Sequence, residues 1–242
     1  NEGYTYNLTG QIQKDFANGF NMMVAYTYGD GQAIFEGTSS QNSSQWRGGF
    51  SVDGRNQTVL GRSDFALGSR LIAGGGYTQN WATGNGIFDS GKTEISFFYN
   101  GQSGNAFSYV YNSRNINNEA GSTSRERSLI YVPANEAEAN LVDTEDFTAA
   151  EQWEMLDEFI SGDSHLSSRR GDYAEKNSNR TPFTHQFDLR IAQDLGIKIG
   201  PSSNRLQVSL DIFNIGNLIN SNWGAVYGNP FDYRLINFEG YD

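Results

Sequence analysis

The sequence predicts an all-β fold, namely an antiparallel transmembrane β-barrel segment of about seven strands with long loops at one end. Apolar and polar residues alternate along successive runs, the runs are long, and the connections between them are short and long in turn. Soluble strands average about 5–6 residues, whereas a tilted strand needs about 9–11 residues to cross a bilayer. An antiparallel β-sandwich also produces alternation, but it gives no reason for long loops to gather at one end. The barrel is therefore the preferred interpretation.

The first two runs predict a hairpin. From Tyr4 to Phe16 the even positions are mostly apolar or aromatic and the odd positions are polar. The tripeptide Ala17-Asn18-Gly19 is a tight-turn signal, after which the alternation resumes from Phe20 to Tyr28. Two alternating runs joined by a short Asn-Gly connection are typical of a β-hairpin.

Five further runs continue the pattern. Their apolar positions are Phe65, Leu67, Leu71, Ala73, Gly75, Tyr77 and Trp81; then Ile95, Phe97 and Tyr99, continued by Phe107, Tyr109 and Tyr111; then Phe187, Leu189 and Ile191; then Leu206, Val208, Leu210 and Ile212; and finally Tyr233 and Leu235. Connections after the first, third and fifth runs are short, and those after the second and fourth are long, at about 35–63 and 112–184. This asymmetry is typical of an outer-membrane barrel, whose long loops lie outside the cell.

Many aromatic residues lie towards the ends of the runs. A ring with a polar tip is favoured at the boundary between lipid and water, so these residues predict two aromatic girdles, although aromatic core packing is an alternative. The residues concerned are Tyr4, Tyr6, Phe16, Phe20, Tyr26, Tyr28, Tyr77, Trp81, Tyr109 and Tyr111.

The long insertion at 112–184 predicts one short helix. Thr148 and Glu151 have capping-box spacing, and Trp153, Leu156 and Ile160 recur at helical intervals before a stop at Gly162. The stripe is interpreted mainly as packing. Because exposed loop aromatics can also anchor a ligand, Trp46 and Trp153 are the candidate ligand-binding residues.

Composition excludes several classes of function. The 17 Lys and Arg against 28 Asp and Glu give a net charge of −11, which argues against a nucleic-acid partner. The absence of Cys rules out disulfides, thiolate metal sites and a Cys nucleophile, and the two His argue against an imidazole metal cluster. The acidic insertion lacks the spacing of a calcium-binding loop. No catalytic, cofactor or metal site is predicted, and the protein is not expected to be an enzyme.

Several segments resemble the C-terminal barrel region of TonB-dependent outer-membrane receptors, in particular the Oar-like kind common in Bacteroidetes. These segments are Ala25-Tyr26-Thr27-Tyr28-Gly29, Gly37-Thr38-Ser39-Ser40, Trp46, Asn100-Gly101-Gln102-Ser103-Gly104, Phe107-Ser108-Tyr109, Leu129-Ile130-Tyr131-Val132-Pro133, Glu151-Gln152-Trp153 with Leu156, Arg169-Arg170-Gly171-Asp172-Tyr173-Ala174-Glu175, Phe187-Asp188-Leu189-Arg190, Asp211-Ile212-Phe213-Asn214-Ile215-Gly216-Asn217-Leu218 and Asn222-Trp223-Gly224. They span most of the chain, and their order and spacing carry the resemblance.

The resemblance implies a barrel of about 22 strands that holds a plug. On this interpretation residues 1–242 are a C-terminal part of the barrel, without plug domain, coupling box or signal peptide, and the seventh run is cut short at Asp242. The implied function is active import of a bulky solute such as a siderophore, glycan or peptide. The implied partners are the outer-membrane bilayer of a Gram-negative cell, the plug and remaining strands, a TonB-type energy-coupling protein and a surface lipoprotein.

Two other functions are compatible with the same pattern. One is an outer-membrane surface or adhesion barrel that only displays binding loops. The other is a soluble secreted glycan-binding β module that uses loop aromatics such as Trp46 and Trp153.

Overall fold

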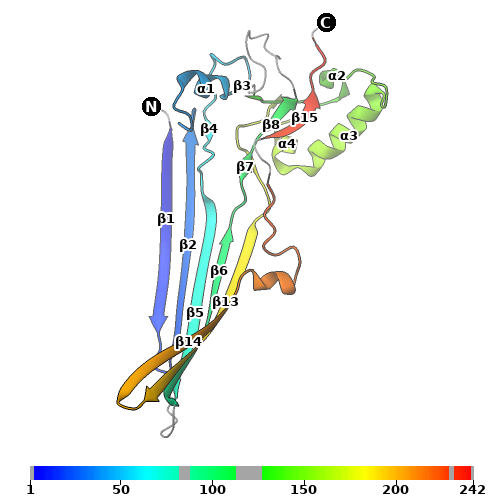
Figure 1. Cartoon of the computed structure of the whole chain (residues 1–242). Helices are drawn as coiled ribbons and strands as arrows, with labels where there is room; N and C mark the ends of the chain where they lie inside the picture. The colour runs from blue at the N-terminus through cyan, green and yellow to red at the C-terminus, as the bar shows by residue number, and fades with distance from the viewer. Residues whose placement is uncertain (1–2, 82–87, 113–126, 229–231, 241–242) are drawn as a thin grey trace.

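Six long strands form an antiparallel meander in a computed structural model, which describes residues 3–81, 88–112, 127–228 and 232–240. The sheet order is β1-β2-β5-β6-β13-β14, and the short strand β4 adds a seventh member by pairing with β2 (Figure 1). The long strands are β1 (Tyr4–Asp15), β2 (Phe20–Ala33), β5 (Gly68–Trp81), β6 (Phe88–Gln102), β13 (Thr184–Ile199) and β14 (Ser202–Ile212). They contain 11 to 16 residues, which is the length that a bilayer-spanning strand requires.

The pairing register places the apolar positions of all six strands on one face. Ile12 pairs with Val24, and the same row continues through Ala73 and Tyr99 to Phe187. Because successive side chains point to opposite faces of a strand, every second row then repeats this apolar character. The intervening rows, such as the one through Arg70 and Gln102, carry the polar residues. The alternation seen in the sequence is thus a property of the whole sheet.

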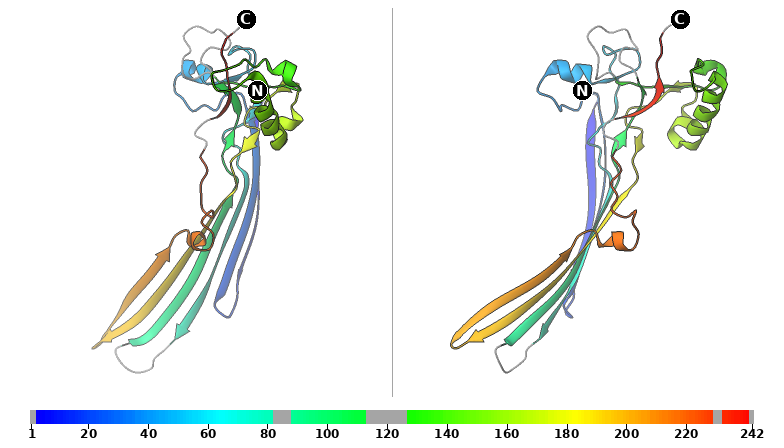
Figure 2. Two further views of the ribbon diagram at one scale, coloured as in Figure 1. Left: turned by 90° about the vertical axis from the view of Figure 1, so that its right-hand side faces the viewer. Right: turned by 45° about the vertical axis from the view of Figure 1, so that its right-hand side comes forward.

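The tight turns lie at one end of the sheet and the long connections at the other. Gly19, with φ +84°, closes the β1–β2 turn, in which the Phe16 amide donates to the Phe20 carbonyl over 2.8 Å. Figures 1 and 2 show a bent, twisted sheet with most of the helices and short strands gathered at the end opposite these turns. Both chain termini lie at this second end (Figure 2).

The long connections and the C-terminal strand fold into a body that we call the cap, made of the described parts of 34–67, 103–183 and 232–240. Its elements are α1 (Asn42–Arg47), β3 (Phe50–Ser51), β4 (Gly61–Arg62), β7 (Ala106–Phe107), β8 (Tyr109–Asn112), β9 (Arg127–Ser128), β10 (Tyr131–Val132), α2 (Glu136–Ala139), α3 (Ala149–Gly162), α4 (Ser164–Ser168), β11 (Asp172–Tyr173), β12 (Asn179–Arg180) and β15 (Tyr233–Asn237). A 3₁₀ helix, η1 (Ile215–Leu218), lies outside the cap and beside β13.

The cap contains a buried apolar core, in which its short strands pack against α3 and α4. The main cluster consists of Tyr109, Ile130, Val132, Leu156, Ile160, Leu166 and Ala174. Val132 and Leu166 are fully buried, and Trp153 packs on the edge of the cluster. A second cluster of Phe50, Val110 and Leu129 lies in the same body.

Helix α3 confirms the predicted helix of the insertion. Its capping box is complete, since Thr148 accepts from the Glu151 amide and the Glu151 carboxylate accepts from the Thr148 amide over 2.9 Å. Leu156 and Ile160 are buried and the helix ends at Gly162, as expected. None of the helices in the described ranges combines the length and apolar character needed to cross a bilayer.

The third predicted run is wrong at its N-terminal end, because Phe65 and Leu67 precede β5, and the fourth is wrong at its C-terminal end. The fourth run was expected to continue through Phe107, Tyr109 and Tyr111, but β6 ends at Gln102 and these residues belong to the cap. Tyr109 is only 4% exposed, so neither it nor Tyr111, which packs beside it, is a girdle residue. The Gly-rich stretch at 101–104 breaks the strand.

The seventh run does not join the main sheet. Its residues form β15, which pairs in parallel with β8 inside the cap, so the prediction of a further barrel strand there is wrong. Alternation alone cannot distinguish these two placements, because a short cap strand covered on one side has the same period. In the described chain β1 and β14 therefore form the two edges of the main sheet.

Candidate functional site

The polar face of the main sheet carries charges that are paired across strands. Arg190 on β13 donates to both carboxylate oxygens of Asp211 on β14, over 2.9 and 3.2 Å. Further along the same two strands, Asp194 accepts hydrogen bonds from Arg205 and Gln207. A face of this kind favours water, because charges placed in an apolar medium pay a large desolvation cost.

The opposite face is apolar and ends in aromatic residues. Leu8, Ile12, Val208 and Leu210 are all more than half exposed there, which is unfavourable in water but favourable in lipid. Towards the cap, Tyr6 lies 6.2 Å from Tyr4 and 6.3 Å from Tyr28 between ring centroids. Towards the turns, Phe16, Phe20 and Trp81 lie at or next to strand ends, and Tyr77 pairs with Phe20. Of the ten predicted girdle residues, Tyr4, Tyr6, Phe16, Phe20 and Trp81 lie at or next to strand ends, whereas Tyr26, Tyr28 and Tyr77 lie further inside β2 and β5, and Tyr109 and Tyr111 belong to the cap.

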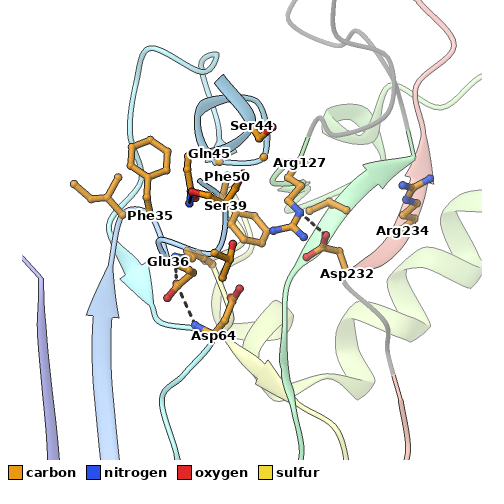
Figure 3. Close-up of a pocket in the computed structure, with 16 residues that line it drawn as sticks. Phe35, Glu36, Ser39, Ser44, Gln45, Phe50, Asp64, Arg127, Asp232 and Arg234 are labelled. Atoms are coloured by element: carbon orange, nitrogen blue, oxygen red, sulfur yellow. Dashed lines mark hydrogen bonds and ion pairs between the residues drawn. The ribbon is translucent and has the colours of Figure 1, made fainter. Parts of the chain in front are cut away.

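A cavity of about 420 Å³ lies in the cap, between the region of α1 and the β8–β9–β15 region (Figure 3). Its walls carry both aromatic rings and charged side chains. The principal lining residues are Phe35, Glu36, Phe50, Asp64, Arg127, Lys176, Asp232 and Arg234. Polar groups from α1, including Ser44 and Gln45, complete one wall.

Glu36 and Lys176 form a buried ion pair in one wall of this cavity. The Lys176 side chain is 1% exposed, and its Nζ lies 2.7 Å from Glu36 Oε1 and 2.8 Å from the Ala33 carbonyl. Glu36 also accepts from the Ser63 hydroxyl at 2.6 Å and from the Asp64 amide at 3.1 Å. Burial alone would raise the pKa of Glu36, but these hydrogen bonds outweigh burial and hold the pKa below its usual value. Glu36 is therefore held as a carboxylate beside Lys176 in the wall of the cavity.

Arg127 and Asp232 form a second pair facing the same cavity. Arg127 Nε lies 3.1 Å from Asp232 Oδ2, and the Asp232 side chain is 7% exposed (Figure 3). Asp232 Oδ1 is buried and accepts no hydrogen bond from the described residues. Burial raises the pKa of Asp232 to about 6, opposed by Arg127 and supported by the negative charge of Asp64. Among the described residues, this carboxylate oxygen is thus a buried acceptor that faces the cavity without a hydrogen-bond partner.

Phe50 links the two ion pairs. The Arg127 guanidinium carbon lies 5.0 Å from the centroid of the Phe50 ring, and Lys176 Nζ lies 5.8 Å from it. Cations within about 6 Å of a ring centroid are attracted by the ring quadrupole. Phe50 thereby holds the cationic partners of both pairs in place.

Asp163, the residue directly after α3, accepts hydrogen bonds from several parts of the cap. It accepts from the Tyr109 hydroxyl and from Asn179 Nδ2, both at 2.6 Å, and its other oxygen caps α4 through the amides of His165 and Leu166. Burial would raise the pKa of Asp163, but these donors lower it below the usual range. Burial together with the Asp163 charge raises the pKa of the Tyr109 hydroxyl. Three separate chain segments are joined at this one carboxylate.

The two predicted ligand-binding residues are not brought together. Trp46 lies on α1 with 41% exposure, donates to Asn56 Oδ1 over 3.2 Å, and has the Arg55 guanidinium carbon 5.4 Å from its ring centroid. Trp153 packs against the core of the cap on α3. Helices α1 and α3 lie on opposite sides of the cap in both figures (Figures 1 and 2).

The cavity residues carry no local signal in the sequence. Glu36 and Lys176 are 140 positions apart, so only the fold brings them together. Among the described residues, no group of three or more His, Asp or Glu side chains is placed to hold a metal ion. The polar groups of the cavity can donate hydrogen bonds to a solute that enters it and can accept hydrogen bonds from that solute.

Comparison with known proteins supports the membrane interpretation of the sheet. No curated protein and no solved structure gave a match. The family described as "Outer membrane beta barrel domain" matches residues 2–232, which is nearly the whole chain. In a protein of this family the apolar face of the main sheet is the face that contacts the lipid bilayer. The chain belongs to the outer membrane beta barrel domain family and is a protein of the outer membrane.

Proposed function

We propose that this chain forms part of an active transporter that imports a bulky solute, such as a siderophore, glycan or peptide, across the outer membrane. The observation that carries the proposal is the combination of a charged inner face with two unpaired sheet edges, β1 and β14. Bacterial outer-membrane barrels have at least eight strands, so these edges need partners. A wide barrel of about 22 strands would supply them and leave a lumen large enough for a plug and a solute.

In this proposal the cap cavity provides an early contact for the solute at the cell surface. Asp232 Oδ1 would accept a hydrogen bond from a hydroxyl or amide of the solute, and Arg127 and Arg234 would donate. Trp46, exposed on α1 beside the cavity-lining Ser44 and Gln45, stays a candidate ligand contact. For Trp153, packing against the core of the cap favours a structural role.

The transport step would involve no covalent chemistry. Energy would come from the inner membrane through a TonB-type coupling protein that acts on a plug inside the barrel, and a surface lipoprotein would assist capture. The paired charges of β13 and β14 would line the route, since a polar wall lets a hydrated solute pass without desolvating it.

Uptake measurements test this proposal. Deleting the gene should abolish uptake of one nutrient, and a protonophore should stop uptake in the wild type while leaving surface binding intact. Asp232→Ala should weaken binding of that nutrient, because it removes the acceptor oxygen, whereas Asp146→Ala, which removes an exposed carboxylate elsewhere on the cap, should not. Unchanged uptake of every candidate nutrient after deletion would count against transport.

A surface or adhesion barrel is the second candidate function, and the folded cap favours it. A cap with its own buried core presents a rigid surface, as a binding module does. This function predicts partner binding that a protonophore does not change, together with unchanged nutrient uptake after gene deletion.

A further inference from the structure

The segment that follows β14, residues 213–227, leaves the sheet abruptly. Asn214, two residues after the strand ends at Ile212, adopts a left-handed conformation with φ 54°. Its amide donates to the Asp188 carboxylate oxygen Oδ1 over 2.8 Å, which attaches the chain to β13 just beyond the end of β14. We call residues 213–227 the boundary segment.

The boundary segment is seated against the lipid-facing side of β13. The Trp223 ring centroid lies 5.6 Å from that of Phe187, which belongs to the apolar row running through Tyr99 and Ala73. Gly216 lies so close to both rings that a Cβ there would be 2.9 Å from Phe187 and 3.1 Å from Trp223. Figures 1 and 2 show η1 beside β13, below the cap.

Several apolar side chains of the boundary segment are largely exposed. Leu218 is 82% exposed, Ile219 is 79% exposed and Val226 is 75% exposed, and these are among the most exposed apolar side chains in the described chain. Tyr227 is 48% exposed beside them. Exposed apolar side chains grouped in one segment mark an interaction site rather than ordinary surface.

The height of the segment follows from the length of β14. Its 11 residues rise about 3.3 Å each along the strand, which at a tilt of about 40° spans about 28 Å of the bilayer. The hydrocarbon core is about 25–30 Å thick, so Ile212 reaches the outer boundary of the lipid. The boundary segment therefore begins where acyl chains meet headgroups.

We propose that the boundary segment is a membrane-interface element, which inserts Leu218 and Ile219 into the acyl chains of the outer leaflet and places Trp223 at the headgroup level. Lipid is the occupant because the segment continues the apolar face that already contacts the bilayer. An irregular backbone is excluded from the hydrocarbon centre but suits the interface, where water and headgroups satisfy its polar groups. The segment also satisfies some of them itself, for example Ile219 N to Gly216 O at 3.0 Å and Trp223 N to Asn220 O at 2.9 Å.

Spin labelling of the intact protein in phospholipid vesicles tests this proposal, helped by the absence of native Cys from this chain. Leu218→Cys and Ile219→Cys are labelled with a nitroxide, and collisions with oxygen and with a water-soluble nickel chelate are compared. Leu210→Cys on the apolar face of β14 is the lipid control, and Val142→Cys, an exposed apolar position on the cap, is the water control. We expect the ratio of oxygen to nickel collisions at both test positions to approach that of Leu210 and to exceed that of Val142 several-fold.

Two results would overturn the proposal. A ratio equal to that of Val142 would place the segment in water, and low collision rates with both reagents would show that protein covers it. If the Cys variants fail to assemble, the Trp223 fluorescence, taken as the difference between wild type and Trp223→Phe, is measured in brominated lipids. Quenching should be strongest when the bromine lies near the headgroup end of the acyl chain, and no quenching by any brominated lipid would contradict the assignment.

Discussion

Lys176 illustrates how a single residue of the insertion fixes the cap to the first long loop. Its ammonium group is almost completely buried and depends on Glu36 for its counter-charge. A buried ion pair is weak evidence for net stability, but removing one partner is costly because the other charge stays buried and unpaired. The ion pair therefore holds together two segments that are far apart in the chain.

Lys176→Met should destabilise the cap by about 3–5 kcal/mol, since it strands the Glu36 carboxylate. Hydrogen exchange of the cap amides measures this loss. Arg169→Met, which breaks an ion pair with the largely exposed Asp172 inside the cap, is the matched control and should cost at most about 1 kcal/mol. Adding Glu36→Gln to Lys176→Met should restore part of the stability, and failure to do so would show that the charge is not the cause.

Asp232 should titrate near pH 6, because burial opposes its ionisation. A raised pKa means that the folded cap holds the proton more tightly than the unfolded chain does. The contribution of Asp232 to cap stability should therefore be fully present below about pH 4, be lost as the pH rises to about 6, at a cost of about 3 kcal/mol, and stay constant above. The carboxyl ¹³C signal that disappears in Asp232→Asn reports the midpoint, and a midpoint near pH 4 would contradict the burial.

At the residue scale, the ligand-binding roles of Trp46 and Trp153 stay predictions, and the sequence says little about the contacts of single side chains. Trp46 and Trp153 were selected for being aromatic and in loops, yet Trp153 packs against the core of the cap. The charged residues of the cavity look like ordinary solvated charges in the sequence, because their partners are distant along the chain. Their role depends on contacts that no local pattern encodes.

At the scale of elements, α3 shows what local chemistry can predict. The capping box and the stripe at Leu156 and Ile160 identify both ends and the buried side of the helix. Hydrogen bonds between residues close in the sequence fix where such a helix begins, so the sequence is sufficient to predict it. The last barrel run fails for the opposite reason, since the parallel partner of β15 is β8, more than a hundred residues away.

Thr148→Ala should weaken the first turn of α3 by about 1 kcal/mol, because it leaves the Glu151 amide without its acceptor. Amide exchange at the start of α3 measures the change. Glu154→Gln, at an exposed position of the same helix, should leave exchange there unchanged. Equal protection in wild type and Thr148→Ala would mean that packing alone holds the helix start.

At the scale of the whole molecule, the sheet has two chemically different faces that the sequence reveals through its period. The register joins the apolar rows of six strands into one surface, and the polar rows into another. Long membrane-length strands leave few alternatives for this alternation, which is why the barrel fold was predictable. The cap was not, because its small sheets and cavity arise from segments without a common period.

A charge on the lipid-facing surface should impair assembly. Val208→Lys places an ammonium in the apolar face of β14, at a cost of about 2–4 kcal/mol near the bilayer midplane. Ser209→Lys, the next residue on the same strand, points to the polar face and should be tolerated. Heat-modifiable mobility of the full barrel in gels measures assembly, and equal assembly of both variants would argue against distinct faces.

The central claim is that β14 and its neighbours present one face to lipid and the other to a water-filled lumen. A cysteine scan of the intact protein in membranes tests this most directly, using Leu206→Cys, Gln207→Cys, Val208→Cys, Ser209→Cys and Leu210→Cys. A membrane-impermeant maleimide should label positions 207 and 209 and spare 206, 208 and 210. Uniform labelling, or labelling of the even positions alone, would contradict the assignment of the two faces.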